Sequence, residues 1–178
     1  MDKHLRRSVQ SRVLETEHIS IIEQLNPLTN LKKHKGVTGA GVLFLALDTG
    51  RCLFQLRNSD KRHKNTWGFW GGMIEGNETP YECIQRELDE EIGFVPELKK
   101  LNPIDTYQSK DKNFMYYSFV YVIDKEFIPT LNGETCGYAW VDIGKWPKPL
   151  HDGARSTLGR NKGCLLYTSD AADDTPCV

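Results

Sequence analysis

Apolar and polar positions follow one another along the chain in segments that predict both strands and helices. Thr38 to Asp48 is a nearly continuous apolar run, which is typical of a buried strand. Arg51 to Arg57 follows after the tight turn at Thr49-Gly50, so the two segments predict a β-hairpin. Further along, Asn113 to Asp124 and Gly137 to Ile143 are rich in aromatic and β-branched residues, which predicts two more strands.

Helical periodicity occurs in three places. Residues 4–25 carry an apolar stripe that should end at Asn26-Pro27. Pro80 to Ile92 predicts a second helix, and His151 to Leu158 predicts a short final one. The order of helix, hairpin, helix and strands indicates an α+β fold with a mixed sheet.

Composition places the chain among ordinary globular proteins. Its 178 residues are 39% hydrophobic and 26% charged, with a formal net charge of -1. This charge does not select nucleic acid as a partner, and the longest apolar stretch, Ala40 to Leu47, is too short to cross a membrane. The N-terminus lacks the pattern of a secretory signal, and the five cysteines lack metal-finger spacing. We therefore expect a cytoplasmic protein; its oligomeric state is not readable from the sequence.

The last fifteen residues do not continue the pattern of the preceding chain. Residues 164–178 have no amphipathic period and resemble the in-frame translation of a transposase-type sequencing adapter. An ordinary flexible tail is the alternative. We expect three segments: an N-terminal helical extension at 1–36, the main folded domain at 37–163, and an adapter-derived tail at 164–178.

The helix at Pro80 to Ile92 has strong local start and stop signals. Thr79 is a favourable N-cap, Pro80 suits the first helical position, and Glu82 completes a capping box. Gly93 is the residue expected just beyond the helix end. The boundaries of this helix are therefore well determined by sequence.

Two different faces of this helix follow from 100° per residue. An apolar stripe of Ile84, Leu88 and Ile92 should pack on the sheet. Beside it, three glutamates fall within about 100° of arc and form a carboxylate ridge: Glu87, Glu90 and Glu91. A solvated acidic face would explain the ridge, and so would a divalent cation, since Mg²⁺ prefers carboxylate oxygens.

The residues around the ridge decide between these interpretations. The stretch from Gly72 to Phe94 resembles the Nudix box, G-x5-E-x7-R-E-U-x-E-E-x-G-U, at every defined position. The matching residues are Gly72, Glu78, Arg86, Glu87, Leu88, Glu90, Glu91, Gly93 and Phe94. Seven fixed positions make a chance match on the order of one in 10⁸ per starting point. The resemblance covers only these 23 residues directly.

The resemblance implies a Nudix-type α/β/α sandwich and a role for each matching residue. Glu87, Glu90 and Glu91 are implied to bind Mg²⁺, or alternatively Mn²⁺, with the backbone at Gly72 close to the metal. Arg86 is implied to orient a glutamate and Glu78 to support the site. The implied reaction is hydrolysis of the diphosphate linkage in a nucleotide-type small molecule.

Residues outside the box have two interpretations each. Trp67, Phe69 and Trp70 could stack a nucleobase or belong to the core, and Trp70 stands where many relatives have proline. Glu134 could supply a general base. The basic loop Asp60 to Lys64 could contact a substrate phosphate or be solvated.

Simpler roles are expected for four other polar residues. Three tyrosines on the aromatic strand are expected to be sheet residues: Tyr116, Tyr117 and Tyr121. His151 is expected to be a surface histidine.

Two other functions remain open at this point. A catalytically silent Nudix-like module could sense a nucleotide, although the intact glutamate set argues against it. Removal of pyrophosphate from an RNA 5′ end would share the same site chemistry. It would favour a basic groove that the modest net charge does not demand. The sequence leaves the substrate unidentified.

Truncation after Gly163 should leave the melting temperature and any activity of the protein unchanged, because the tail shows no packing pattern. Thermal unfolding of the full and truncated chains checks this. A clear loss of either property would show that residues 164–178 belong to the fold.

Overall fold

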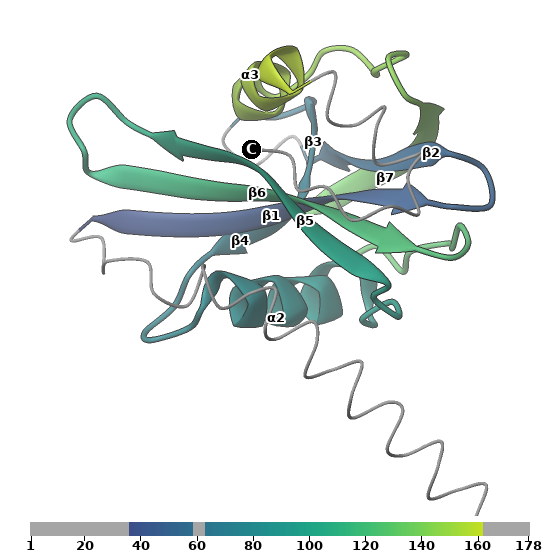
Figure 1. Cartoon of the computed structure of the whole chain (residues 1–178), viewed down its shortest axis with the longest axis horizontal. Helices are drawn as coiled ribbons and strands as arrows, with labels where there is room; N and C mark the ends of the chain where they lie inside the picture. Colours follow the sequence, from purple (N-terminus) through teal and green to yellow (C-terminus); the bar gives the residue numbers. More distant parts are fainter. Residues whose placement is uncertain (1–35, 59–62, 162–178) are drawn as a thin grey trace, which may run out of the picture. The chain divides into compact units, whose positions relative to one another are not determined.

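A mixed β-sheet dominates the computed structural model, which describes residues 36–58 and 63–161 (Figure 1). The helices α2 and α3 lie on opposite faces of the sheet, as expected for the α/β/α sandwich (Figure 1). The elements in chain order are β1 (Val37–Ala46), β2 (Arg51–Arg57), β3 (Trp67–Gly68), β4 (Trp70–Met73), α2 (Pro80–Ile92), β5 (Lys100–Gln108), β6 (Phe114–Ile123), β7 (Thr135–Asp142) and α3 (Asp152–Arg160).

Strand β1 lies at the centre and contacts three other strands. It runs parallel to β6 over its whole length. Its opposite edge pairs first with β4, up to Val42 opposite Trp70, and then with β2, from Phe44 opposite Leu53. The partner strand therefore changes between Val42 and Phe44, and β2 and β4 diverge at this point.

Each face of the sheet has its own apolar packing. On one face, Leu43 and Leu45 of β1 cluster with Val120 of β6 and Leu158 of α3. On the other face lies α2, whose stripe of Ile84, Leu88 and Ile92 is completely buried. Burial of such side chains stabilises the fold by roughly 1.5–3 kcal/mol each. The predicted apolar stripe is thus confirmed.

The ends of α2 are fixed by the predicted caps. The Thr79 hydroxyl accepts a hydrogen bond from the Glu82 amide at 3.2 Å, and the Glu82 carboxylate accepts one from the Thr79 amide at 2.8 Å. Gly93 ends the helix with a φ of 78°, a left-handed conformation that favours glycine. These local contacts define where α2 begins and ends.

Most predicted elements are confirmed, with three differences. The last predicted strand begins two residues earlier, at Thr135. Strand β5 was missed, because Pro103 and its polar neighbours break the apolar alternation, and the register shifts there. Strands β3 and β4 were not predicted, because they are very short. The helix predicted for 4–25 and the tail at 164–178 lie outside the described residues.

Candidate active site

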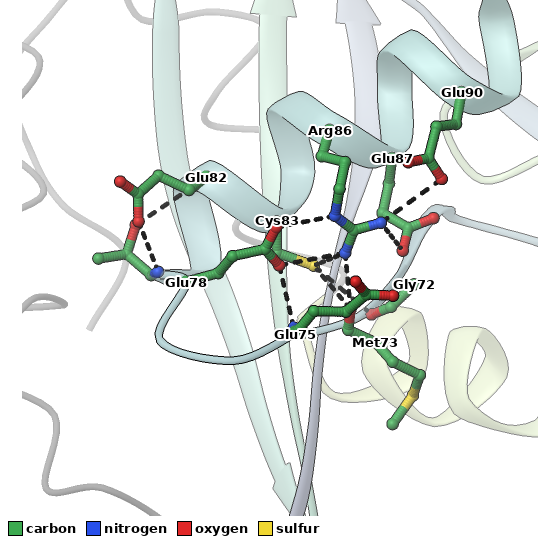
Figure 2. Close-up of polar contacts among 10 residues, drawn as sticks. Gly72, Met73, Glu75, Glu78, Glu82, Cys83, Arg86, Glu87 and Glu90 are labelled. Carbon is green, nitrogen blue, oxygen red and sulfur yellow. Dashed lines mark hydrogen bonds and ion pairs between the residues drawn. The ribbon is translucent and has the colours of Figure 1, made fainter.

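Arg86 of α2 joins the loop that precedes the helix to two of its glutamates (Figure 2). Its Nε and Nη2 donate to the two carboxylate oxygens of Glu78 at 2.8 and 3.1 Å, and Nη2 also donates to the Met73 carbonyl at 2.9 Å. Its Nη1 donates to Glu87 Oε1 at 2.8 Å and approaches Glu90 Oε2 at 3.5 Å. Hydrogen bonding to Arg86 lowers the pKa of Glu78. Glu78 therefore contacts Arg86, and Arg86 contacts Glu87, while the roles that the resemblance implies for these residues stay predictions.

Glu87 lies directly against the backbone of Gly72. A Cβ placed on Gly72 would be 2.2 Å from Glu87 Oε1 and 2.6 Å from Oε2, much closer than atoms can approach. The carboxylate thus occupies the space that any side chain at position 72 would need. Burial raises the pKa of Glu87, Arg86 lowers it, and the charges of Glu90 and Glu134 raise it again. Glycine at 72 is therefore required for this position of the carboxylate.

Helix geometry alone places Glu91 on a ridge with Glu87 and Glu90, but in the structure Glu91 is not exposed to solvent. Its side chain reaches the gap between the diverging strands, and the residue is 5% exposed. Its carboxylate accepts hydrogen bonds from the Gly71 amide at 2.8 Å and from Gln55 Nε2 at 3.3 Å. Burial raises the pKa of Glu91 to about 8, although both donors and the charge of Arg57 oppose this shift. The ridge is therefore graded from a buried Glu91 to an exposed Glu90.

The remaining two carboxylates lie closer to solvent. The side chain of Glu90 is 57% exposed. Its backbone carbonyl accepts a hydrogen bond from Asn132 Nδ2 at 3.0 Å, which connects α2 to the segment before β7. Glu134 follows in that segment and is also exposed. Because its charge acts on Glu87, Glu134 lies on the same side of the molecule as the carboxylates of α2.

The donor set fits a hard divalent cation. Glu87 and Glu91 offer carboxylate oxygens, and Glu91 is a buried acid whose hydrogen-bond partners are neutral amides. Within residues 36–58 and 63–161, no three acidic, histidine or cysteine side chains form a ready metal cage. Mg²⁺ does not need one, since it commonly takes one or two carboxylates and fills its shell with water and substrate phosphates.

The aromatic candidates before the box are packed into the structure. Trp70 is completely buried and Phe69 is 8% exposed, so stacking of a nucleobase on either ring would require the core to open. Trp67 is half-buried and packs against the core cluster on the α3 face. Trp70, which stands where many relatives have proline, is thus part of the core. Base stacking by these residues stays a prediction.

Two residues of the site were missed at the sequence level. Gln55 is 1% exposed, donates to the Phe69 carbonyl at 2.7 Å, and accepts from the Thr135 hydroxyl at 2.8 Å. These contacts orient its amide toward Glu91. Gln55 lies in a β2 segment that reads as an ordinary strand, and Thr135 precedes the strand predicted from Gly137. Only the pairing of β2 with β7 brings them together.

Solved structures with the same arrangement of elements come from several microorganisms. A MutT NUDIX hydrolase from Burkholderia pseudomallei has a TM-score of 0.56 at 20% identity, covering 70% of this chain and 97% of that one. The Nudix hydrolase RenU from M. smegmatis has a TM-score of 0.60 at 17% identity, covering 79% and 91%. A MutT protein from Methanosarcina mazei has a TM-score of 0.58 at 19% identity, covering 74% and 97%. At these identities the likeness shows the fold.

Curated relatives match over shorter parts and carry different activities in their names. An isopentenyl-diphosphate Delta-isomerase from Burkholderia multivorans is 27% identical over 119 residues, which is 62% of this chain and 66% of that protein. An RNA pyrophosphohydrolase from Halorhodospira halophila is 41% identical over 54 residues, 30% of this chain and 28% of that protein. An ADP-ribose pyrophosphatase from Methanocaldococcus jannaschii is 28% identical over 69 residues, 39% and 41% respectively. This chain therefore spans less than two thirds of each relative's length.

The sequence model of the NUDIX domain matches residues 36–159, which include all the strands, α2 and most of α3. The match extends well beyond the 23 residues of the box, and it agrees with the fold and with the complete set of box residues. The chain therefore belongs to the Nudix hydrolase family.

Proposed function

We propose that this protein hydrolyses the diphosphate linkage of a nucleoside diphosphate attached to another group X, with Mg²⁺ as cofactor and Mn²⁺ as a substitute. The observation that carries the proposal is the pair of Glu87 and Glu91. One carboxylate is pressed against Gly72, and the other is buried with neutral hydrogen-bond partners. A divalent cation held by these carboxylates would stabilise the charged form of Glu91.

In this proposal the side chains of α2 bind the cation and hold its carboxylate ligands in position. Glu87, Glu90 and Glu91 would hold the cation, with the backbone of Gly72 close to it. Arg86 keeps Glu87 in position through the contacts described above, and Glu78 keeps Arg86 in position. A bound Mg²⁺ would neutralise phosphate charge and lower the pKa of water.

Glu134 is the proposed general base. It is exposed near the carboxylates of α2, and its charge acts on Glu87. A carboxylate there would accept a proton from the water that attacks phosphorus. The new phosphorus–oxygen bond replaces the bridging one, and the products are a nucleoside monophosphate and a phosphorylated X.

Two further features accompany the proposal. The described cysteines Cys52, Cys83 and Cys136 are free thiols, which supports a reducing, cytoplasmic location. Among the helices of the described segments, none combines the length and apolarity needed to cross a membrane.

Turnover of a substrate panel with and without metal tests the proposal. The panel comprises nucleoside triphosphates, ADP-ribose, nucleotide sugars, dinucleoside polyphosphates and a 5′-triphosphorylated RNA, with isopentenyl diphosphate as a test for isomerisation. We expect at least one nucleotide to release a monophosphate with Mg²⁺ or Mn²⁺, and we expect chelation to abolish the reaction. Undiminished turnover after exhaustive chelation would contradict the proposed cofactor. A folded, metal-loaded protein inactive on the whole panel would favour the silent sensing module.

Glu91→Gln should cripple catalysis without unfolding the protein. Glutamine keeps the size of the side chain and can still accept the Gly71 N–H, but it removes the anionic charge. The loss of activity should exceed the roughly 10–100-fold typical of removing an outer partner of a metal ligand.

The matched control is Asp89→Asn, which removes a carboxylate from an exposed position on the same helix. Steady-state kinetics at saturating Mg²⁺ and a thermal melt compare the two variants. Equal activity of Glu91→Gln and Asp89→Asn would show that Glu91 does not bind the metal.

Gly72→Ala should also lower activity, for a steric reason. The new methyl group would occupy the space of the Glu87 carboxylate, which would have to swing away from the site. Because the displaced group is the end of a flexible side chain, the melting temperature should change little, while activity falls roughly 10–100-fold.

Gly159→Ala is the control for this steric effect, since nothing lies within 4 Å of its added Cβ. It should retain full activity and gain up to about 1 kcal/mol of helix stability. Retention of wild-type activity by Gly72→Ala would mean that the observed position of Glu87 is not needed.

A further inference from the structure

Three side chains that can carry positive charge gather beside the proposed catalytic site. Arg57 ends β2, His63 lies in the loop that follows, and His151 caps the start of α3. The two imidazole rings meet edge to face, with centroids 4.6 Å apart and planes at 70°. We call Arg57, His63 and His151 the basic cluster.

Gly68 and the backbone of β3 hold this cluster together. A Cβ placed on Gly68 would lie 3.9 Å from Arg57 Cδ and 3.7 Å from His151 Cβ, so both side chains flank the same glycine. The His151 amide donates to the Trp67 carbonyl at 2.8 Å, and the Trp67 amide donates to the Pro149 carbonyl at 2.8 Å. The backbone at His151 is thus hydrogen-bonded to β3, and Arg57 belongs to strand β2.

The orientation of the His151 ring is also fixed. Its Nδ1 accepts a hydrogen bond from the Gly153 amide at 3.1 Å, so the neutral ring carries its hydrogen on Nε2. Burial lowers the pKa of His151, the charges of His63 and Arg57 lower it further, and Asp152 raises it. An anion placed in the cluster would reverse this shift and would receive the Nε2–H bond.

Arg57 connects the cluster to the carboxylate site. Arg57 and His151 flank Gly68, and Gly68 pairs with Gln55, whose side chain donates to Glu91. The basic cluster therefore lies one strand pair away from the buried carboxylate. A phosphate chain bound at Glu87 and Glu91 through a cation therefore has a basic region beside it. The cation there neutralises only part of the charge of a longer polyphosphate, and the basic cluster can neutralise more.

We propose that the basic cluster binds a further phosphate group, beyond the two phosphates that the cleaved linkage joins. This inference rests on the proposed function and narrows its substrate class. A nucleoside triphosphate or a dinucleoside polyphosphate carries such a group, whereas ADP-ribose places a neutral sugar there. Arg57 would supply N–H donors from its planar guanidinium, and His151 would donate its Nε2–H while Nδ1 keeps its hydrogen bond from Gly153.

Replacing His63 and His151 with asparagine removes the imidazole rings, and asparagine suits the backbone conformation at both positions. His63 has a φ of 59°, and asparagine tolerates this left-handed conformation better than most residues. His151 caps α3, and asparagine is a favourable N-cap. The control is Lys148→Gln, which removes an exposed positive charge three residues before His151. A thermal melt of each variant at pH 8 checks that it is folded.

The first experiment compares two substrates on the full-length protein with Mg²⁺. In His63→Asn/His151→Asn, kcat/KM for a nucleoside triphosphate should fall roughly tenfold or more, mainly through KM, as expected for lost bonds to a charged group. The kcat/KM for ADP-ribose should stay at the wild-type value, and Lys148→Gln should alter neither. Equal loss for both substrates, or no loss for either, would overturn the proposal.

The second experiment does not require turnover, so it separates this inference from the proposed function. Imidazole NMR signals of His63 and His151, assigned with the single variants, are recorded at constant pH with increasing inorganic pyrophosphate. Pyrophosphate should shift the signals of both rings relative to sodium chloride at equal ionic strength. If neither ring's signals shift, the basic cluster is only a packing contact between His63 and the start of α3, whatever the protein hydrolyses.

Discussion

The buried carboxylate of Glu91 is the constraint on which the site depends. A carboxylate in this position must be protonated, hydrogen-bonded or matched by a cation, because burial disfavours its charge. The protein supplies two neutral donors, Gly71 and Gln55, and burial still raises the pKa of Glu91 to about 8. The fold therefore holds a buried acid close to the point where the partner of β1 changes from β4 to β2.

Two groups of residues hold the carboxylates of the site, one from the side of α2 and one from the sheet. Arg86 and Glu78 fix the second carboxylate, Glu87, through charge-assisted hydrogen bonds, and Gly72 makes room for it. Gln55 and Thr135 act from the sheet, where strand pairing leaves them little freedom. A site held from both the helix and the sheet keeps its carboxylates in place before any ligand arrives, which lowers the cost of binding.

Much of this arrangement could be predicted from the sequence, because its signals are local. The capping box at Thr79 and Glu82, the glycine at 93 and the apolar stripe of α2 all lie within one helix, and each is confirmed. The spacing of the box then identified the family and the roles it implies. The hairpin of β1 and β2 could also be predicted, since a turn between two apolar runs is a short-range pattern.

The features that could not be predicted depend on contacts between distant segments. Helix periodicity placed Glu91 beside Glu90 and gave no sign that strands would cover only one of them. Gln55 meets Glu91 through tertiary packing, and His63 meets His151 because β3 pairs with the segment before α3. Sequence reasoning treated His151 as a surface histidine, whereas it is half-buried and caps a helix. Strand β5 was missed because its proline and polar residues hide an edge strand.

Crystals of the protein soaked in Mn²⁺ would test the central claim most directly, through anomalous scattering from the metal. The account predicts a peak in contact with the carboxylates of Glu87 and Glu91, next to the backbone of Gly72, that disappears in Glu91→Gln. A peak bound only at the exposed Glu90, or one that persists unchanged in Glu91→Gln, would contradict the assignment of the buried carboxylate to the metal.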